Sequence, residues 1–369
     1  RGLGDVYKRQ GMDIHCTDKF GQSVPAPTTT QAYTSNGASS TQPKLDIPSL
    51  PAQDQFTWFK RQVVGWDYKQ LVGYLNALQD QATQDGDWHK MIDTLTLMMD
   101  RRYHCGKLRR SSLLSLADQA FARTIESIKS AKPDGFILQQ AGSPLPEYAA
   151  DGQTVLVDAR GYSPEDETSL AREIQRLYQA GFTRFLVVHT RGHRFIGNGL
   201  GSNTVGVRID VYGSPGDYLA SGIDGSQIQV HNHAQDQLAQ IMKSGKLVVH
   251  GDAGQTFMYA AKGGQVYVLG NTAGRPLINA VGKPKVVING TCLDYLAESF
   301  MAGDPLNGGG FVVLNGLTVD EHNQIQELDT PYPGGNLFSL ASGGAIYVRD
   351  PHEKVSSDQL NGGEFAPLT

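Results

Sequence analysis

The second half of the chain repeats one short pattern six times: IDVYG (209–213), IQVHN (228–232), LVVHG (247–251), VYVLG (266–270), VVING (286–290) and VVLNG (312–316). Successive segments begin 19, 19, 19, 20 and 26 residues apart. A nearly fixed period of this size is typical of a solenoid, in which each repeat buries its apolar face only against its neighbours. The pattern therefore predicts a stacked-repeat domain.

The columns of this repeat indicate which kind of solenoid it is. The first and third positions are always branched aliphatic residues, for example Ile209 and Val211. Residues two apart on a strand share a face, so these two columns are predicted to line the interior. The fifth position is glycine or asparagine, which enter a left-handed conformation at the least cost, so it predicts one corner per coil. The corner residues are Gly213, Asn232, Gly251, Gly270, Gly290 and Gly316.

A further apolar column lies nine residues before four of these strands and predicts a second strand on each coil. Helical repeats need longer apolar-periodic stretches and do not tolerate glycine at this density. We therefore expect a mainly β chain built on a right-handed, single-stranded parallel β-helix. Its open ends need caps, for which a βαβ-like unit over 154–188 and a strand over 346–348 are candidates. The further apolar column consists of Leu219, Leu238, Phe257 and Leu277.

Changes in composition along the chain predict its domains. Residues 1–10, RGLGDVYKRQ, resemble a translated sequencing adaptor, and 11–53 are predicted to be a disordered linker because they contain almost no periodic apolar residues. Apolar spacings of three and four predict a small α-helical module over 54–140. The β-helix domain with its βαβ-like cap is predicted over 151–355, and a C-terminal tail over 356–369.

The composition of the chain argues against several functional classes. The 369-residue chain carries a formal net charge of −5, which argues against a dedicated nucleic-acid or membrane-surface binder. It has no run of about 18 apolar residues, so no membrane span is expected. Its three cysteines, Cys16, Cys105 and Cys292, are far apart and fit a reducing cytoplasm better than a disulfide framework. We therefore expect a cytoplasmic protein.

Three longer stretches resemble a known family: RGHRFIGNGLG (191–201), GDAGQTFMYAAKGGQVYVLG (251–270) and SLASGGAIYVRD (339–350). Together with the coils around them, they make residues 154–348 similar to the C-terminal GXGXG domain of the glutamate synthase large subunit. In that family the domain is a scaffold between a glutamine amidotransferase and a flavin-binding barrel. The resemblance implies a non-catalytic scaffold subunit of a glutamate synthase-like oxidoreductase complex in glutamate biosynthesis, with amidotransferase-like and FMN-binding subunits as partners.

The resemblance also implies where the cofactors lie. FMN and the iron–sulfur cluster are expected on partner subunits and none on this chain, because no barrel of about 250 residues fits here and the cysteines lie 89 and 187 residues apart. No catalytic residue is predicted, and whether the chain counts as an enzyme stays open. A similar β-helix in a subunit of formylmethanofuran dehydrogenase makes another redox complex an alternative. A polysaccharide-active β-helix enzyme is a weaker one, since it needs paired carboxylates and the outward column offers only Asp210.

The histidines of the repeat raise the question of a metal. His231 and His250 share one column on successive coils, and His233 lies two residues from His231. Stacked imidazoles about 5 Å apart could share a zinc or iron ion. The rest of the column, including Tyr212 and Leu269, supplies no consistent ligand set. An exposed polar ladder is therefore the favoured interpretation, and no metal site is predicted.

One outward column suggests a contact surface. The second position of the repeat changes from polar Asp210 and Gln229 to four apolar residues. An exposed apolar stripe on a rigid solenoid usually marks a contact, so we predict that it is covered by the helical module or by a partner subunit. The four stripe residues are Val248, Tyr267, Val287 and Val313.

Basic residues at two places are weaker candidates for partner contact. Arg191 and Arg194 lie between a predicted strand and a loop, where solvated loop residues are the alternative. A second basic cluster lies between two predicted helices. It could bind phosphate or an acidic patch, but solvated helix ends are the favoured interpretation. This cluster consists of Arg101, Arg102, Lys107, Arg109 and Arg110.

Overall fold

The computed structural model describes residues 45–146 and 152–366. The adaptor-like stretch and most of the predicted linker, residues 1–44, therefore lie outside the described residues, as do 147–151 and 367–369. The chain from Leu45 onward clusters as one compact unit.

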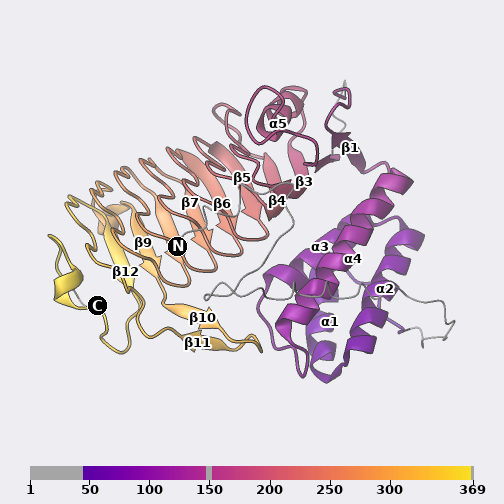
Figure 1. The fold of residues 1–369 in the computed structure, drawn as a ribbon, viewed down its shortest axis with the longest axis horizontal. Coiled ribbons are helices and arrows are strands. Elements are labelled where there is room, and N and C mark those ends of the chain that lie inside the picture. The colour runs from indigo at the N-terminus through magenta and orange to yellow at the C-terminus, as the bar shows by residue number, and fades with distance from the viewer. Residues whose placement is uncertain (1–44, 147–151, 367–369) are drawn as a thin grey trace, which may run out of the picture. The chain divides into compact units, whose positions relative to one another are not determined.

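One continuous parallel sheet links all coils of the solenoid (Figure 1). The architecture is a parallel β-solenoid of about seven turns, which confirms the fold class predicted from the repeat. In spatial order the ten strands are β1 (Phe136–Gln140), β2 (Thr154–Asp158), β3 (Arg184–Arg191), β4 (Arg208–Ser214), β5 (Asp224–Val230), β6 (Ser244–Val249), β7 (Gln265–Val268), β8 (Lys285–Ile288), β9 (Phe311–Leu314) and β12 (Ala345–Val348).

The inward columns form the solenoid core as predicted. Ile209 pairs with Ile228, and Ile228 with Leu247, so equivalent positions stack directly on one another. No residue of the first and third columns is more than 2% exposed. These columns are Ile209, Ile228, Leu247, Val266, Val286 and Val312, and Val211, Val230, Val249, Val268, Ile288 and Leu314.

The prediction of a second strand on each coil is wrong. The apolar side chains of that column are buried, as Leu238 at 0% exposure shows, but their backbone forms turns. Every second residue of these turns is left-handed, and in one coil Gln237, Ala239 and Ile241 have φ of 58°, 49° and 57°. The prediction that this column faces the core is therefore correct, but the column lies on a left-handed backbone that residues other than glycine rarely adopt.

These turns bond to both neighbouring coils without being strands. The Ala239 amide donates to the Leu219 carbonyl of the preceding coil at 2.8 Å. The amides of Gln237 and Ile241 donate instead to the following coil, to the carbonyls of Gln255 (2.7 Å) and Tyr259 (2.8 Å). The amides of successive left-handed residues therefore donate to the two neighbouring coils in turn, and these buried peptide groups are satisfied as in a sheet.

The predicted left-handed corner at the fifth position is correct only at its two ends. Gly213 and Gly316 have φ of 109° and 63°, whereas Asn232, Gly251, Gly270 and Gly290 do not have positive φ. Close stacking explains the inner glycines. A Cβ on Gly270 would lie 2.8 Å from the Gly251 carbonyl oxygen, and the Gly270 amide donates to that same oxygen at 3.0 Å. Glycine is thus required there by the close approach of the preceding coil.

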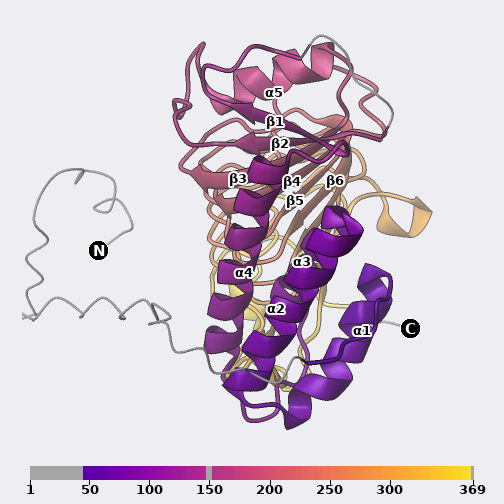
Figure 2. The same ribbon diagram turned by 90° about the vertical axis from the view of Figure 1, so that its right-hand side faces the viewer.

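The N-terminal end of the solenoid is closed by a helix. α5 (Leu170–Gln179) connects β2 to β3, and its side of Leu170, Ile174 and Leu177 is fully buried in the solenoid core. This is the predicted βαβ-like unit, with β1 added as one further parallel strand beyond β2. Figure 2 shows α5 lying across the end of the coils beside β1 and β2.

The other end is closed by β12 and by part of the predicted C-terminal tail. β12 pairs with β9, which confirms a strand over 346–348. The segment after β12 bonds to the turn before it: the Leu337 amide donates to the Gln359 carbonyl at 2.7 Å, and the Asn361 amide donates to the Leu337 carbonyl at 3.1 Å. Residues up to 361 therefore continue the ladder of the last coil, so the solenoid extends past the predicted boundary at 355.

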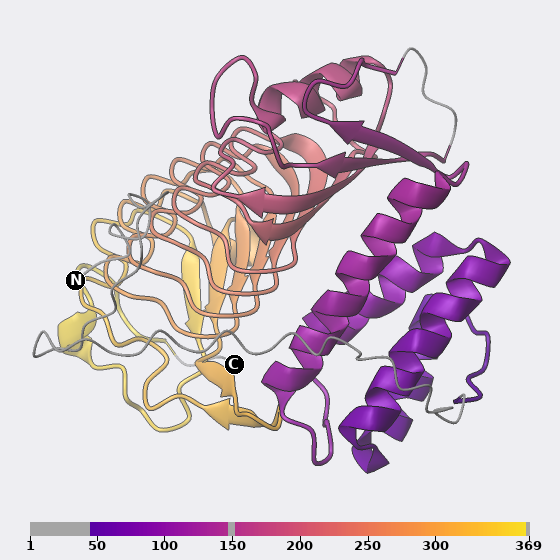
Figure 3. The ribbon, with the colours of Figure 1, turned by 45° about the vertical axis from the view of Figure 1, so that its right-hand side comes forward.

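The predicted helical module contains four helices, which Figure 3 shows beside the sheet. They are α1 (Ala52–Gln62), α2 (Tyr68–Asp85), α3 (Trp88–Asp100) and α4 (Arg110–Ala131). α1 begins inside the predicted linker and Ile47 is buried, so the module takes in the linker's last residues. Three short 3₁₀ turns, Val63–Gly65, Pro305–Asn307 and Ser357–Gln359, complete the helical elements of the described chain.

The module packs on the outer face of the first solenoid strands. Leu156, Leu186, Val188 and Tyr212 from β2, β3 and β4 belong to the same buried cluster as the helices. A hairpin of β10 (Leu317–Val319) and β11 (Ile325–Glu327) reaches the module from the other end.

The hairpin is tied to the loop between α3 and α4. The buried Asn323 amide group donates to the Tyr103 carbonyl at 2.9 Å, and the Arg110 backbone amide donates to the Glu321 carbonyl at 3.4 Å. The solenoid therefore holds the module at two separate places.

Candidate functional site

Buried charge concentrates where α3 meets the solenoid. Asp100 ends α3, Asp210 lies on β4, and His231 directly follows β5. His231 Nδ1 lies 2.8 Å from Asp100 Oδ2, and His231 Nε2 lies 3.2 Å from Asp210 Oδ1. The side chains of all three are at most 6% exposed. One imidazole therefore bridges a carboxylate of the module and a carboxylate of the solenoid.

The histidine stack predicted from the repeat is confirmed, but it is covered. The rings of His231 and His250 are 5.3 Å apart and inclined by 12°, and Tyr212 stacks on His231 at 4.2 Å. His250 Nε2 also lies 3.3 Å from Asp100 Oδ2. The expectation of an exposed ladder is wrong because α3 lies over it, leaving His250 with 15% exposure and His231 with 1%.

The two histidines carry different charges. Burial would lower the pKa of His231, but hydrogen bonds to Asp100 and Asp210 outweigh it and raise the pKa to about 9. Burial lowers the pKa of His250 to about 4. Burial would raise the pKa of Asp210, yet hydrogen bonds from His231 and Arg208 bring it below its ordinary value. At neutral pH His231 is thus an imidazolium, and His250 is a neutral ring.

This cluster suits a proton better than a metal ion. Single ligand atoms of Asp100, His231 and His250 lie within 4.8 Å of one another. A metal, however, must lie near the plane of each imidazole that binds it, and two nearly parallel, stacked rings do not direct their nitrogens to one point. Both nitrogens of His231 also already face carboxylates.

A hydrogen bond and a ring contact next to this cluster also hold the helical module on the outer face of the sheet. The hydroxyls of Thr96 and Tyr212 are 2.7 Å apart, and the ring of Phe121 stacks on Tyr212 at 4.4 Å. Sequence analysis missed Asp100 and Thr96, which lie more than 100 positions from their partners in the chain. The only signal was a carboxylate and a histidine, Asp210 and His231, in adjacent outward columns.

The apolar stripe lies beyond the module. Val248, Val287 and Val313 are half-buried and Tyr267 is 37% exposed. None of the four belongs to the buried cluster that the helices form, so within the described residues the module does not cover the stripe. Coverage by a partner subunit stays a prediction.

The two candidate arginines differ in their surroundings. Arg191 is exposed at the end of β3. Arg194 forms ion pairs with Glu165 (2.5 Å) and Asp217 (3.1 Å) and lies over the ring of Tyr218. Arg194 therefore braces the loops beside α5, whereas Arg191 has its side chain toward solvent.

The basic cluster between α3 and α4 is only partly solvated. Arg110 is 8% exposed and donates to the carbonyls of Met98 (3.0 Å), Met99 (2.5 Å) and Arg101 (3.0 Å), which satisfies the end of α3. Interpreting Arg110 as a solvated helix end is therefore wrong.

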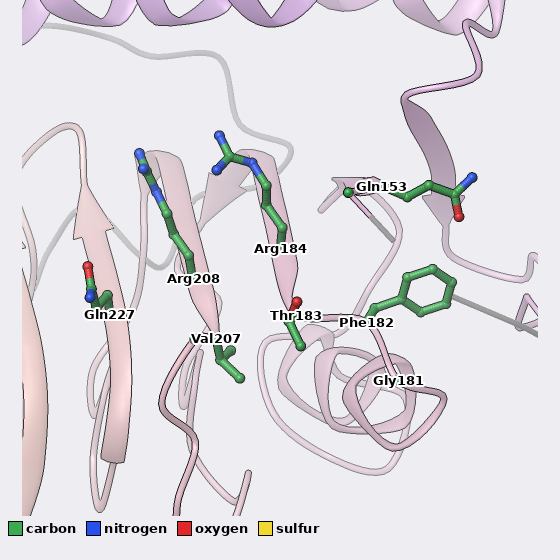
Figure 4. Close-up of a pocket in the computed structure, with 10 residues that line it drawn as sticks. Gln153, Gly181, Phe182, Thr183, Arg184, Val207, Arg208 and Gln227 are labelled. Atoms are coloured by element: carbon green, nitrogen blue, oxygen red, sulfur yellow. The ribbon is translucent and has the colours of Figure 1, made fainter. Parts of the chain in front are cut away.

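A pocket of about 370 Å³ opens where the chain enters β2, β3 and β4, beside Gln227 of β5. Figure 4 shows Arg184 and Arg208, which are paired in register, extending side by side from adjacent strands. Arg208 is committed to Asp210, with Nε 2.7 Å from Oδ2. Arg184 is thus the arginine available to a ligand, beside the uncharged polar side chains of Thr183 and Gln227.

The described cysteines do not fit an iron–sulfur cluster, which is held by several thiolates close together. Cys105 and Cys292 are both buried and unpaired. Burial raises the pKa of the Cys292 thiol to about 12, so it is not a ready ligand. Cys16 lies outside the described residues. None of the described helices has the length and apolar character needed to span a membrane.

Fold and junction together define a parallel β-solenoid protein that carries a helical module on one half of its sheet. The sequence model of the GXGXG motif family matches residues 166–363, which is more than half of the chain. The chain therefore belongs to the GXGXG motif family, which includes the C-terminal domain of the glutamate synthase large subunit. Neither the curated proteins nor the solved structures searched contained a match.

Proposed function

We propose that this chain is a non-catalytic scaffold subunit of a glutamate synthase-like oxidoreductase complex. The family match over 166–363 is the observation that carries the proposal. The complex would act in glutamate biosynthesis in the cytoplasm. An amidotransferase-like subunit would release ammonia, and an FMN- and iron–sulfur-dependent subunit would consume it.

The geometry supports such a role in one respect. A solenoid whose coils repeat in register is a rigid spacer, because each coil is bonded to both neighbours through the sheet and through the turns. Its outer face has one half occupied by the module and one half, with Tyr267, open. A rigid body with an open face can hold two enzyme subunits at a fixed separation.

Affinity purification of the chain from the cells that produce it tests the proposal. We expect an amidotransferase-like and an FMN-binding subunit to co-purify, and the assembly to form glutamate from glutamine and 2-oxoglutarate with a reductant. The chain expressed alone should be colourless. Stoichiometric flavin or iron–sulfur absorption in the chain alone, or native purification without either subunit, would contradict the proposal.

A further inference from the structure

The open half of the outer face has an unusual composition. From β6 onward, three columns point outward, at the position before each repeat segment and at its second and fourth positions. None of these positions, all of which the structure describes, carries a carboxylate. By strand they are Lys246, Val248 and His250; Gln265, Tyr267 and Leu269; Lys285, Val287 and Asn289; Phe311, Val313 and Asn315; and Ala345, Tyr347 and Arg349. Of these, His250 lies at the boundary with the module, where α3 covers it.

The cations of this face are not all neutralised. Arg349 pairs with Glu327 of the hairpin. Lys246 has no carboxylate partner among the described ion pairs and lies 5.1 Å over the ring of Tyr267, and Lys285 forms no ion pair within the described residues either. A chain of net charge −5 thus presents one positively charged, apolar surface.

The loop between α3 and α4 lies at one edge of this face. Arg101 and Arg102 directly follow Asp100, whose carboxylate lies 3.3 Å from His250 Nε2 at the β6 edge of this face. These two residues belong to the basic cluster that sequence analysis singled out. Arg102 also lines a pocket with Asp320 and Glu321 of the hairpin, so the lysines of the solenoid supply the unpaired charge of this face.

We infer that this face, centred on Tyr267 and Val287, docks a separate protein subunit whose contact surface combines apolar side chains with Asp and Glu. Charge complementarity fixes the sign of the partner, and the apolar stripe fixes its centre. The inference deepens the proposed function and rests on it for the kind of subunit that binds.

Two other occupants fit less well. A second copy of this chain, placed face to face, would bring the same positive charge onto both sides of the contact. Nucleic acid binds through many phosphate contacts, and the middle of this face is valine and tyrosine rather than lysine and arginine. The apolar centre and basic border are instead the anatomy of a protein interface.

Site-specific photocrosslinking in the cells that produce the chain tests the inference. Tyr267 is replaced by p-benzoylphenylalanine, and the control carries the same residue at Ile241, which is 46% exposed in the turn segment away from the sheet. After irradiation the crosslinked peptides are identified by mass spectrometry. We expect a peptide from a different protein, rich in Asp and Glu, at position 267 and not at 241.

Charge reversal distinguishes docking from chance proximity. The double change Lys246→Glu and Lys285→Glu should lower the crosslink yield at 267 by about tenfold, because each removes attraction to the partner's carboxylates and adds repulsion. Lys132→Glu, in an exposed lysine beyond α4, should leave the yield unchanged. A crosslink to a second copy, to nucleic acid or to lipid, or equal yields at 267 and 241, overturns the inference.

The experiment also separates this inference from the proposed function. An acidic partner that is not a glutamate synthase-type subunit would leave the docking face correct and the scaffold role wrong. Co-purification of synthase subunits that crosslink elsewhere would do the reverse.

Discussion

The two halves of the outer sheet face differ in the charged residues that they carry. Under the helical module, the outer face carries Asp158, Asp210 and His231. On the open half, the same columns carry Val248, Val287 and no carboxylate. The covered half thus buries paired charges among apolar side chains, whereas the open half has an apolar centre with lysines at its border.

The difference indicates two kinds of contact. Ion pairs and hydrogen bonds with fixed directions, such as Asp100 with His231 at 2.8 Å, specify one register of the module on the solenoid. Such contacts add little net stability but penalise any misalignment, because each would leave a buried charge unpaired. An apolar stripe with a charged border leaves alignment to the shape and charge of whatever binds it.

The largest expected effect comes from placing a carboxylate in one column of each half. Leu186 is 6% exposed beneath the module, and Val287, in the same column, is half-exposed on the open half. We expect Leu186→Asp to lower the free energy of unfolding by about 4 kcal/mol or more, since it buries an unpaired charge. Val287→Asp should cost about 1 kcal/mol or less.

Urea denaturation measures this pair of variants. All three tryptophans, Trp58, Trp66 and Trp88, lie in the helical module, so their fluorescence follows the module, while circular dichroism near 218 nm follows the solenoid. Equal losses in the two variants would show that the halves are not different environments.

Removing one carboxylate of the junction should have the next largest effect. Asp100→Asn keeps the shape of the side chain but leaves the His231 imidazolium with Asp210 alone, and we expect a loss of about 3 kcal/mol in the module transition. Asp80→Asn, in an exposed residue of α2, is the matched control and should stay within about 0.5 kcal/mol. A loss no larger than the control's would mean that the cluster is not what docks the module.

The module should be most stable near pH 6.5. His231 has a folded-state pKa of about 9, above its ordinary value, so its contribution is complete below about pH 6.5 and disappears as pH rises through 9. The loss between pH 6.5 and 9 is about 2.5 kcal/mol. His250 has a folded-state pKa of about 4, so its neutral ring favours folding above pH 6.5, and this contribution is lost as pH falls.

Two variants show which histidine controls each side of this dependence of stability on pH. His231→Gln should flatten the alkaline limb of the urea midpoint measured from pH 6.5 to 9, and His250→Gln should flatten the limb from pH 6.5 to 4.5. An alkaline limb that survives in His231→Gln would show that another group controls it.

The solenoid could be predicted from the sequence because each interior position repeats at the period of the coil. A column such as Ile209, Ile228 and Leu247 repeats at the period of the coil, and each residue meets its own equivalent on the neighbouring coil. Local chemistry was less informative. In the turns around Leu238, every second residue, such as Gln237 and Ala239, is left-handed. Glutamine and alanine do not predict that conformation.

The junction could be predicted only in part, for a different reason. His231 and His250 were placed on one stack because the repeat determines their spacing. Their burial depends on α3, which is 131 positions away at Asp100 and carries no repeat. Contacts between a periodic domain and a non-periodic one leave no common pattern in the sequence, so the covered half of the sheet was mistaken for an exposed one.

The smallest effect, and the finest test of the comparison, is a change of one methyl to a hydroxyl on each half. Val188 is 1% exposed in the buried cluster shared with the helices, and a threonine there would bury a hydroxyl where apolar side chains surround it. We expect Val188→Thr to lower the free energy of unfolding by about 1 kcal/mol.

At half-exposed Val287 water can reach the hydroxyl, so Val287→Thr should change the urea midpoint of the chain alone by no more than the error of the measurement. If a partner subunit covers the open face in the assembled complex, the same Val287→Thr variant should weaken assembly without changing the stability of the isolated chain. A loss of stability in the isolated chain would place Val287 in the molecule's own core and remove the difference between the two halves.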